Sequence, residues 1–351
     1  MRLAIVGAKG SGKSTLFRAF TGASAAPAAA DGSHVAVVKV RDERLEWLRD
    51  FHKPRKYTPV AVEVVDFPGM PDSSETTGMK LSELLANARE TEGLVVCIRA
   101  FEDPTYPYKN AAPNATAEAA QVIGELAFAD LDVAVKRIEK LEKKHVPLDV
   151  EKRELAALLR IRQTLEEGKP VKSVALTPEE QKLLRGFRFL TQKPWVLVVA
   201  LPDSGGDELV AKIEGPFEAR IGVRTKIEAE VAELDAGDRA AFMADLGIEA
   251  LASESVLRAS FLALGTIPFF TSGEDEVRAW PITRGANAVE AAGKIHTDLA
   301  RGFIRAEVYS FDDFKAAGGD VNAVKKAGRF RVEGKEYVVQ DGDILNIRFS
   351  V

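Results

Sequence analysis

The feature that most constrains the fold lies at the start of the chain. An apolar run, residues 3–6, leads directly into "GAKGSGKST" at residues 7–15, and an apolar-periodic stretch follows. The spacing G-x-x-x-x-G-K-S between a predicted strand and a predicted helix is that of a phosphate-binding loop, or P-loop. Such a loop binds the phosphates of a nucleotide, but it specifies neither the base nor whether the nucleotide is hydrolysed.

Each residue type in this loop has a chemical reason. Glycines let the backbone wrap around the phosphates with its amide groups pointing inward. Lys13 is predicted to reach the β- and γ-phosphates as a catalytic residue, and the Ser14 hydroxyl is predicted to bind Mg²⁺. The helix that begins near Lys13 adds its partial positive charge. The predicted nucleotide-binding residues are Gly7, Ala8, Lys9, Gly10, Ser11, Gly12, Lys13, Ser14 and Thr15.

A second motif, "VEVVDFPGM" at residues 62–70, has the D-x-x-G form. It predicts that Asp66 holds Mg²⁺ and that the Gly69 amide senses the γ-phosphate, as a second catalytic group. Met70 follows where many small GTPases carry a water-orienting glutamine. A thioether cannot order an attacking water, so hydrolysis should be slow or use another group. Alternatively, Met70 simply packs against the sheet.

A P-loop kinase is the least favoured class of P-loop protein for this chain, because no acceptor site or lid is visible in the sequence.

The hydrophobic pattern divides the chain into regions. Buried strands are predicted at 2–7, 35–40, 60–66, 94–100 and 195–201, with helices at 13–21 and 79–91, which indicates a mostly parallel sheet covered on both faces. Apolar residues at helical spacing, interrupted by "VPLD" at 146–149, predict an antiparallel helical hairpin. A further helix is predicted with Thr177 as N-cap and Pro178 at its first position, and two more at 239–247 and 253–264.

After residue 267 short strands alternate with helical segments near 286–300 and 312–327. The predicted fold class is therefore α/β, with three domains. A P-loop NTPase domain covers 1–125 and 191–266, an inserted helical (coiled-coil) arm covers 126–190, and a small α+β domain covers 267–351.

Composition limits the classes of function. The net charge of −5 gives no general nucleic-acid signal, and the single cysteine, Cys97, excludes an internal disulfide. Apolar runs are far shorter than the roughly 20 residues of a membrane span. We expect a cytoplasmic protein with no membrane partner and no sequence-specific DNA binding. Residues 131–190 carry 14 Lys+Arg against 10 Asp+Glu, which fits either a solvated helical face or an RNA-contacting arm.

Several segments resemble a known family. They are "LLANARETE" at 84–92, "RAFED" at 99–103, "IEAEVAELD" at 227–235 and, most closely, 276–308 and 334–351. The sequence resembles the YchF branch of the Obg-related translation-factor GTPases over nearly its whole length. The resemblance implies a C-terminal β-grasp (TGS) domain, NTPase activity with a hydrophobic residue in place of the glutamine, and association with ribosomes or RNA.

The chain departs from that family where the base is read. The family carries N-x-x-E after a Lys-Pro pair and tends to favour ATP; here Lys193 and Pro194 are followed by "ALPD" at 200–203. Asp203 could accept hydrogen bonds from guanine N1 and N2, which favours GTP, or it could be a polar turn residue. The expected ligand is therefore a purine nucleotide, GTP or ATP, with Mg²⁺.

The switch regions depart as well. Gly10 replaces the usual asparagine of the P-loop, and "AAADGSHV" at 28–35 replaces the segment with the switch I threonine, for which Ser33 or Thr21 are candidate substitutes. The glycine-rich switch II is replaced by "PDSSETTGMK" at 71–80. His296 is a lone histidine, and a structural role is favoured for it.

Two hypotheses follow from these motifs. The first is a slow NTPase switch that docks on ribosomes or RNA. The alternative is a hydrolysis-deficient nucleotide- or ribosome-binding protein that acts through the helical arm and the TGS domain.

Overall fold

The structure is a computed structural model that describes residues 1–22, 32–70, 81–107 and 114–350. The chain forms two compact units. The first combines Met1–Val38 with Glu63–Ala263, and the second combines Lys39–Val62 with Leu264–Val351. The helical arm thus belongs to the first unit, and a segment near residue 50 belongs to the unit of the C-terminus. The division into three domains stays a prediction.

A six-stranded sheet forms the centre of the first unit, in the order β2-β4-β1-β5-β6-β7. Parallel pairings join β4, β1, β5, β6 and β7 in turn. All residues of β5 and β6 are buried, because helices cover both faces of a parallel sheet. The predicted sheet is confirmed. Its strands are β1 (Arg2–Val6), β2 (His34–Lys39), β4 (Ala61–Asp66), β5 (Gly93–Arg99), β6 (Trp195–Ala200) and β7 (Ala219–Val223).

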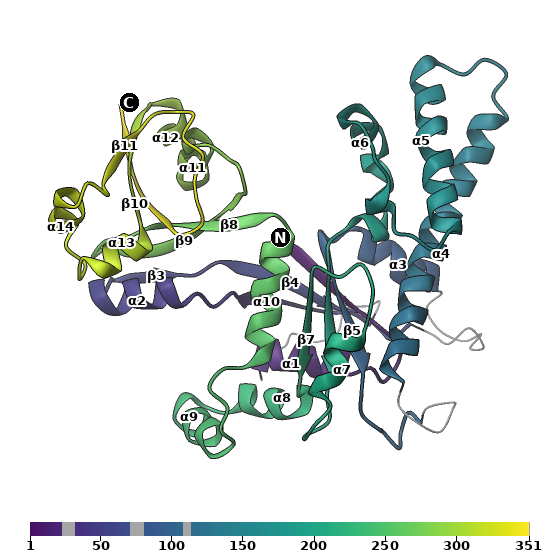
Figure 1. Ribbon diagram of the computed structural model, residues 1–351, viewed down its shortest axis with the longest axis horizontal. Helices are drawn as coiled ribbons and strands as arrows, with labels where there is room; N and C mark the ends of the chain where they lie inside the picture. Colours follow the sequence, from purple (N-terminus) through teal and green to yellow (C-terminus); the bar gives the residue numbers. More distant parts are fainter. Residues whose placement is uncertain (23–31, 71–80, 108–113, 351) are drawn as a thin grey trace. The chain divides into compact units, whose positions relative to one another are not determined.

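Helices surround this sheet (Figure 1). Those predicted at 13–21, 79–91, 239–247 and 253–264 are confirmed with small shifts at their ends. The short α7, β7 and α8 were not predicted; in β7 only Val223 is buried, so the strand has almost no hydrophobic signature. The helices are α1 (Lys13–Thr21), α3 (Leu81–Arg89), α7 (Asp207–Lys212), α8 (Thr225–Glu233), α9 (Ala236–Asp245) and α10 (Ala252–Ala263).

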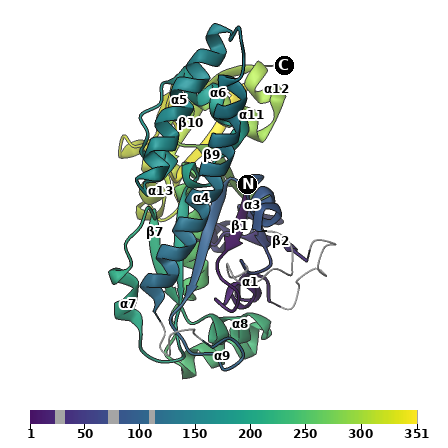
Figure 2. The ribbon, with the colours of Figure 1, turned by 90° about the vertical axis from the view of Figure 1, so that its right-hand side faces the viewer.

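The predicted hairpin consists of α4 (Ala115–Glu142) and α5 (Asp149–Glu166), followed by α6 (Pro178–Leu184). Ile138, Leu158 and Ile161 are buried between the helices. The Thr177 hydroxyl accepts a hydrogen bond from the Glu180 amide, which confirms the predicted cap. Figure 2 shows that α4 runs without a break from beside the sheet into the hairpin. Its first half packs in the core of the sheet and only its second half forms the arm.

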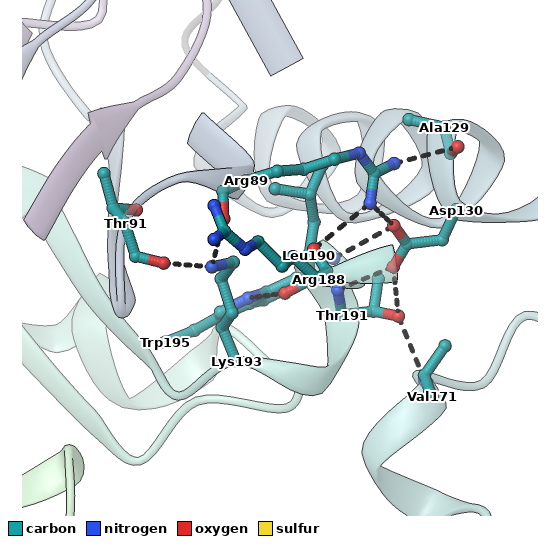
Figure 3. A network of polar contacts seen from close by, with 10 residues as sticks. All are labelled: Arg89, Thr91, Ala129, Asp130, Val171, Arg188, Leu190, Thr191, Lys193 and Trp195. Atoms are coloured by element: carbon teal, nitrogen blue, oxygen red, sulfur yellow. Dashed lines mark hydrogen bonds and ion pairs between the residues drawn. The ribbon is translucent and has the colours of Figure 1, made fainter. Parts of the chain in front are cut away.

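A buried carboxylate fixes the base of the arm (Figure 3). The Asp130 side chain, on α4, is fully buried. It accepts hydrogen bonds from the amides of Leu190 and Thr191 at 2.9 and 2.8 Å, and from the Thr191 hydroxyl at 2.8 Å. The Arg89 guanidinium, at the end of α3, completes the set at 2.6 Å. The full complement of donors makes a buried charge tolerable here.

The second unit contains a mixed sheet in the order β11-β10-β12-β8-β9-β3. The predicted α+β architecture is confirmed, and between α14 and β12 the chain forms one short strand, Arg331–Glu333. The strands are β3 (Lys56–Thr58), β8 (Thr266–Thr271), β9 (Glu276–Thr283), β10 (Phe303–Ser310), β11 (Arg331–Glu333) and β12 (Asp343–Phe349). The helices are α2 (Glu43–His52), α11 (Ala288–Ile295), α12 (Thr297–Arg301), α13 (Phe311–Ala316) and α14 (Val321–Lys326).

The elements α2 and β3 were not predicted and come from the middle of the N-terminal region. β3 pairs in parallel with β9. The Trp47 ring of α2 stacks on Phe51 at 5.2 Å and meets the rings of Phe311 and Phe314 edge-on at 5.7 and 6.1 Å. Neighbouring strand residues face opposite sides of a sheet. Accordingly Phe269 packs in the cluster with α11, while Phe270 lies under Arg44 of α2.

Candidate nucleotide-binding site

A cavity of about 910 Å³ lies at the carboxyl ends of the parallel strands of the first unit. It is lined by the P-loop, Gly69, the segment 101–106 after β5, the segment 201–203 after β6, and the first turns of α8. The strand register brings these segments together, because Ile5 pairs with Asp66, and Ala200 pairs with both Arg99 and Val223. Ligands of open α/β sheets bind at this edge.

Two P-loop glycines are required by close contacts as well as by backbone conformation. Gly10 has φ +77°, and a Cβ there would lie 2.8 Å from the Tyr106 Cβ. Gly12 has φ +91° directly before α1, and its Cβ would lie 3.2 Å from that of Ala200. Only glycine adopts these conformations readily. The P-loop is therefore packed tightly between Tyr106 and the end of β6.

Lys13 is buried within the loop. Its ammonium donates a hydrogen bond to the Ala8 carbonyl at 2.7 Å. Burial lowers the pKa of Lys13, and the nearby side chains of Cys97, Asp66 and Glu118 partly oppose this shift. The lysine thus lines the cavity and lies near Asp66, the carboxylate predicted to bind the metal.

Asp66 and Ser14, the two residues predicted to bind Mg²⁺, lie close together. Asp66 is buried, which raises its pKa, while a hydrogen bond from the Ser14 hydroxyl lowers it. The Asp66 Oδ1 is buried and accepts no hydrogen bond from any residue that the structure describes. A buried carboxylate oxygen without a partner needs an explanation, and an ion or its water shell supplies one. These residues fit Mg²⁺.

The D-x-x-G loop touches the P-loop. A Cβ on Gly69 would lie 2.6 Å from the Lys9 Cα, so only glycine fits. The Met70 amide donates to the Gly7 carbonyl at 3.0 Å, and its side chain is 3% exposed in the hydrophobic core of the sheet. Met70 therefore packs against the sheet, as the alternative interpretation of this residue expected. Its effect on the rate of hydrolysis stays a prediction.

Asp203, the candidate base-reading residue, lines the cavity from the segment after β6. Its side chain is 62% exposed, and its Oδ2 lies 3.9 Å from the Lys226 ammonium, near the start of α8. Asp203 is thus on the wall of the cavity, and so are Leu201 and Pro202. The preference for GTP or ATP stays a prediction.

The sequence did not single out the segment 101–106 or the start of α8 as site residues. The first is fastened by Arg99, whose guanidinium donates to the Tyr106 carbonyl. The Arg99 amide donates to Glu118 at 3.3 Å, and burial raises the pKa of Glu118 to about 7. One signal was present: both segments follow strands of a parallel sheet at the edge where ligands bind.

The candidate substitutes for the switch I threonine do not line the cavity. Thr21 donates to the Phe17 carbonyl of its own helix at 2.9 Å, and Ser33 is buried. Residues 28–31 and all of 71–80, which hold the altered switch sequences, lie outside the described residues. His296 caps α12 by accepting a hydrogen bond from the Asp298 amide at 3.2 Å, in agreement with a structural role.

Comparison with known proteins identifies the family. A family model described as "50S ribosome-binding GTPase" matches residues 2–128, and the YchF-GTPase C-terminal model, "Protein of unknown function (DUF933)", matches 266–350. The "Ribosome-binding ATPase YchF" of Bacillus subtilis (strain 168) is 37% identical over 362 residues, covering 99% of this chain and 98% of that protein. The chain belongs to the YchF family. The protein of the same name from Haemophilus influenzae gives the same identity and coverage.

A solved YchF structure confirms the fold. The YchF GTPase of Schizosaccharomyces pombe matches with a TM-score of 0.81 and 25% identity, covering 99% of this chain and 97% of that one. The resemblance found in the sequence and the predicted fold class are thus both correct. In the described part of the chain, no helix combines the length and apolar character needed to cross a membrane.

Proposed function

We propose that this YchF-family protein binds a purine nucleoside triphosphate with Mg²⁺ in the cavity and hydrolyses its γ-phosphate slowly. The observation that carries the proposal is the buried Oδ1 of Asp66, which has no partner within the described residues and lies near Ser14 and Lys13, two residues that line the cavity. Two relatives are named ribosome-binding ATPases. A cytoplasmic switch that docks on ribosomes or RNA therefore extends the same proposal.

The roles of the residues follow from their positions. The P-loop amides and Lys13 hold the β- and γ-phosphates, and Gly69 approaches the γ-phosphate with its amide. Ser14 and Asp66 hold Mg²⁺, which when bound neutralises charge on the phosphate oxygens. Asp203 and the neighbouring apolar residues face the base. Met70 contributes packing and no polar group, so slow turnover is expected.

Phosphate release tests the proposal. Purified protein with Mg²⁺ is given ATP or GTP in parallel, and Lys13→Ala serves as the comparison. The variant should release phosphate about 100-fold more slowly, since a lost charge contact in a dry site typically has this effect. The proposal fails if the wild-type rate is no higher than that of the variant, both with and without ribosomes.

One observation favours a second candidate function. Met70 is buried in the core, so the position of the usual glutamine offers nothing that orients a water. A hydrolysis-deficient protein that binds ribosomes through the arm and the C-terminal domain fits this. Co-sedimentation with ribosomes separates the two candidates: the second expects equal binding with ATP, GTP or no nucleotide, whereas a switch expects binding to depend on the nucleotide.

A further inference from the structure

The two lysines of the P-loop lie in different environments. Lys13 is buried, and its ammonium is bonded to the Ala8 carbonyl. Lys9 is exposed to solvent and lines the cavity. Within residues 1–22, 32–70, 81–107 and 114–350, no carboxylate forms an ion pair with Lys9. Among these residues, no carboxylate competes with an anionic ligand in the cavity for the Lys9 ammonium.

The backbone of Lys9 lies where the two nucleotide-binding motifs meet. The contact with Gly69 is so close that a Cβ on the glycine would come within 2.6 Å of the Lys9 Cα and 3.0 Å of its nitrogen. Beside it, Ala8 and Met70 form an isolated parallel bridge. The glycine of a D-x-x-G motif faces the γ-phosphate in P-loop switches. Lys9 thus projects from the γ-phosphate end of the loop.

An aromatic ring lies near the ammonium of Lys9. Its Nζ is 5.7 Å from the centre of the Tyr106 ring, at the outer edge of the cation–π range of about 6 Å. Tyr106 is fixed in turn, because its carbonyl accepts a hydrogen bond from Arg99 and its side chain packs on Gly10. The long side chain of Lys9 is therefore kept along the cavity wall.

We propose that Lys9 is a second catalytic cation, which stabilises the negative charge that develops on the terminal phosphate oxygens during hydrolysis. The inference rests on the proposed function. In the reaction, water adds its oxygen to the γ-phosphorus, and the bond to the β–γ bridging oxygen breaks with its electron pair left on the diphosphate. The protons of the water go to inorganic phosphate and solvent, and Lys9 keeps its own.

The chemical need for such a cation is visible at Met70. Where a glutamine would act in related switches, this chain has a buried thioether that contributes nothing polar. In other P-loop enzymes a cationic finger lowers the barrier by stabilising transition-state charge. Lys9 would supply this charge from within the same chain.

The test compares Lys9→Met, which keeps the length but removes the charge, with Lys9→Arg, which keeps the charge. Turnover of whichever of ATP and GTP the wild type hydrolyses is measured, together with the Kd of the diphosphate alone and with aluminium fluoride, a transition-state mimic. Lys9→Met should lower kcat at least tenfold, change the Kd of the diphosphate less than threefold, and abolish the tighter binding caused by aluminium fluoride. Lys9→Arg should recover most of kcat. Lys212→Ala, an exposed lysine of α7, is the control and should match the wild type.

The possible failures are distinct. If the wild type hydrolyses nucleotide and Lys9→Met has the same kcat, or if only its KM rises, the role of Lys9 is refuted while the proposed function stands. If wild type and Lys13→Ala release phosphate at the same rate, the proposed function fails and the role of Lys9 fails with it.

Discussion

At the scale of single residues, the site depends on charged groups that are taken out of water. Glu118 shows how burial makes the ionised form of a carboxyl group less stable. It lies at the start of α4, is mostly buried, and has a pKa raised to about 7 from an ordinary 4.5, because burial outweighs the hydrogen bond from the Arg99 amide and the charges of Arg99 and Lys13. Between these pH values the folded protein holds a proton that the unfolded chain has lost.

The free energy of unfolding should therefore fall as the pH rises from about 4.5 to about 7, and the loss should be complete above that range. The Glu118→Gln side chain cannot ionise. Between pH 5 and pH 8, the free energy of unfolding should therefore decrease by about 2 kcal/mol less in this variant than in the wild type. Urea unfolding of the nucleotide-free protein at both pH values measures this. Glu142→Gln, an exposed position on the same helix, should behave as the wild type. Equal pH dependence of wild type and Glu118→Gln would contradict the prediction.

At the scale of secondary-structure elements, the helical arm is attached by buried polar bonds rather than by hydrophobic contacts alone. Asp130 joins α4 to the end of α3 and to the chain entering β6 (Figure 3). The Lys193 ammonium donates to the Arg89 carbonyl at 2.9 Å in the same region. These bonds make the orientation of α4 depend on α3, the helix that follows the D-x-x-G motif along the chain.

Asp130→Ala should lower the free energy of unfolding by about 3–5 kcal/mol, because Arg89 and two backbone amides lose their buried acceptor. The same helix offers a matched control. Asp132 pairs with Lys136 at 2.6 Å, but the two side chains are 48% and 68% exposed. Asp132→Ala should therefore change stability by less than about 1 kcal/mol. Chemical denaturation of the two variants measures the difference, and similar losses would show that the buried network does not hold the arm.

At the scale of the whole molecule, the chain path and the folded units do not coincide. The segment Lys39–Val62 belongs with the C-terminal residues. Its helix α2 is fastened by Trp47, which packs on Phe311 and Phe314, and by Phe51, against which Gly319 lies so closely that no side chain would fit there. The second unit is thus assembled from two distant stretches of sequence.

Phe314→Ala should weaken this assembly, since removing a buried phenylalanine typically lowers stability by about 3–5 kcal/mol. Hydrogen exchange should increase in α2 and β3 together with β8 and β9, while β5 and β6 keep their protection. Phe349→Ala, at a partly exposed ring in the same unit, should have a smaller effect. Exchange that rises in β8 and β9 but not in α2 would refute the assignment.

The success of prediction from the sequence depended on how local each signal was. Asp66 and Lys13 could be singled out as candidates because their spacing and flanking strands lie within a few residues, and their roles stay predictions. The helical hairpin was found because Leu158 and Ile161 repeat at helical period. By contrast, β3 has three residues and exists only because β9 pairs with it. Tyr106 reaches the P-loop only through the register of β5, and no local pattern reports that register.

The composite second unit also sets an order of events during synthesis. Val62 leaves the ribosomal tunnel roughly 200 residues before Leu264, a delay on the order of 10–40 s at typical elongation rates. Until then, the apolar face of α2 that later packs on β9 and α13 has no native partner. The nascent chain must keep this face from aggregating, and the fold is completed only when the last strands emerge.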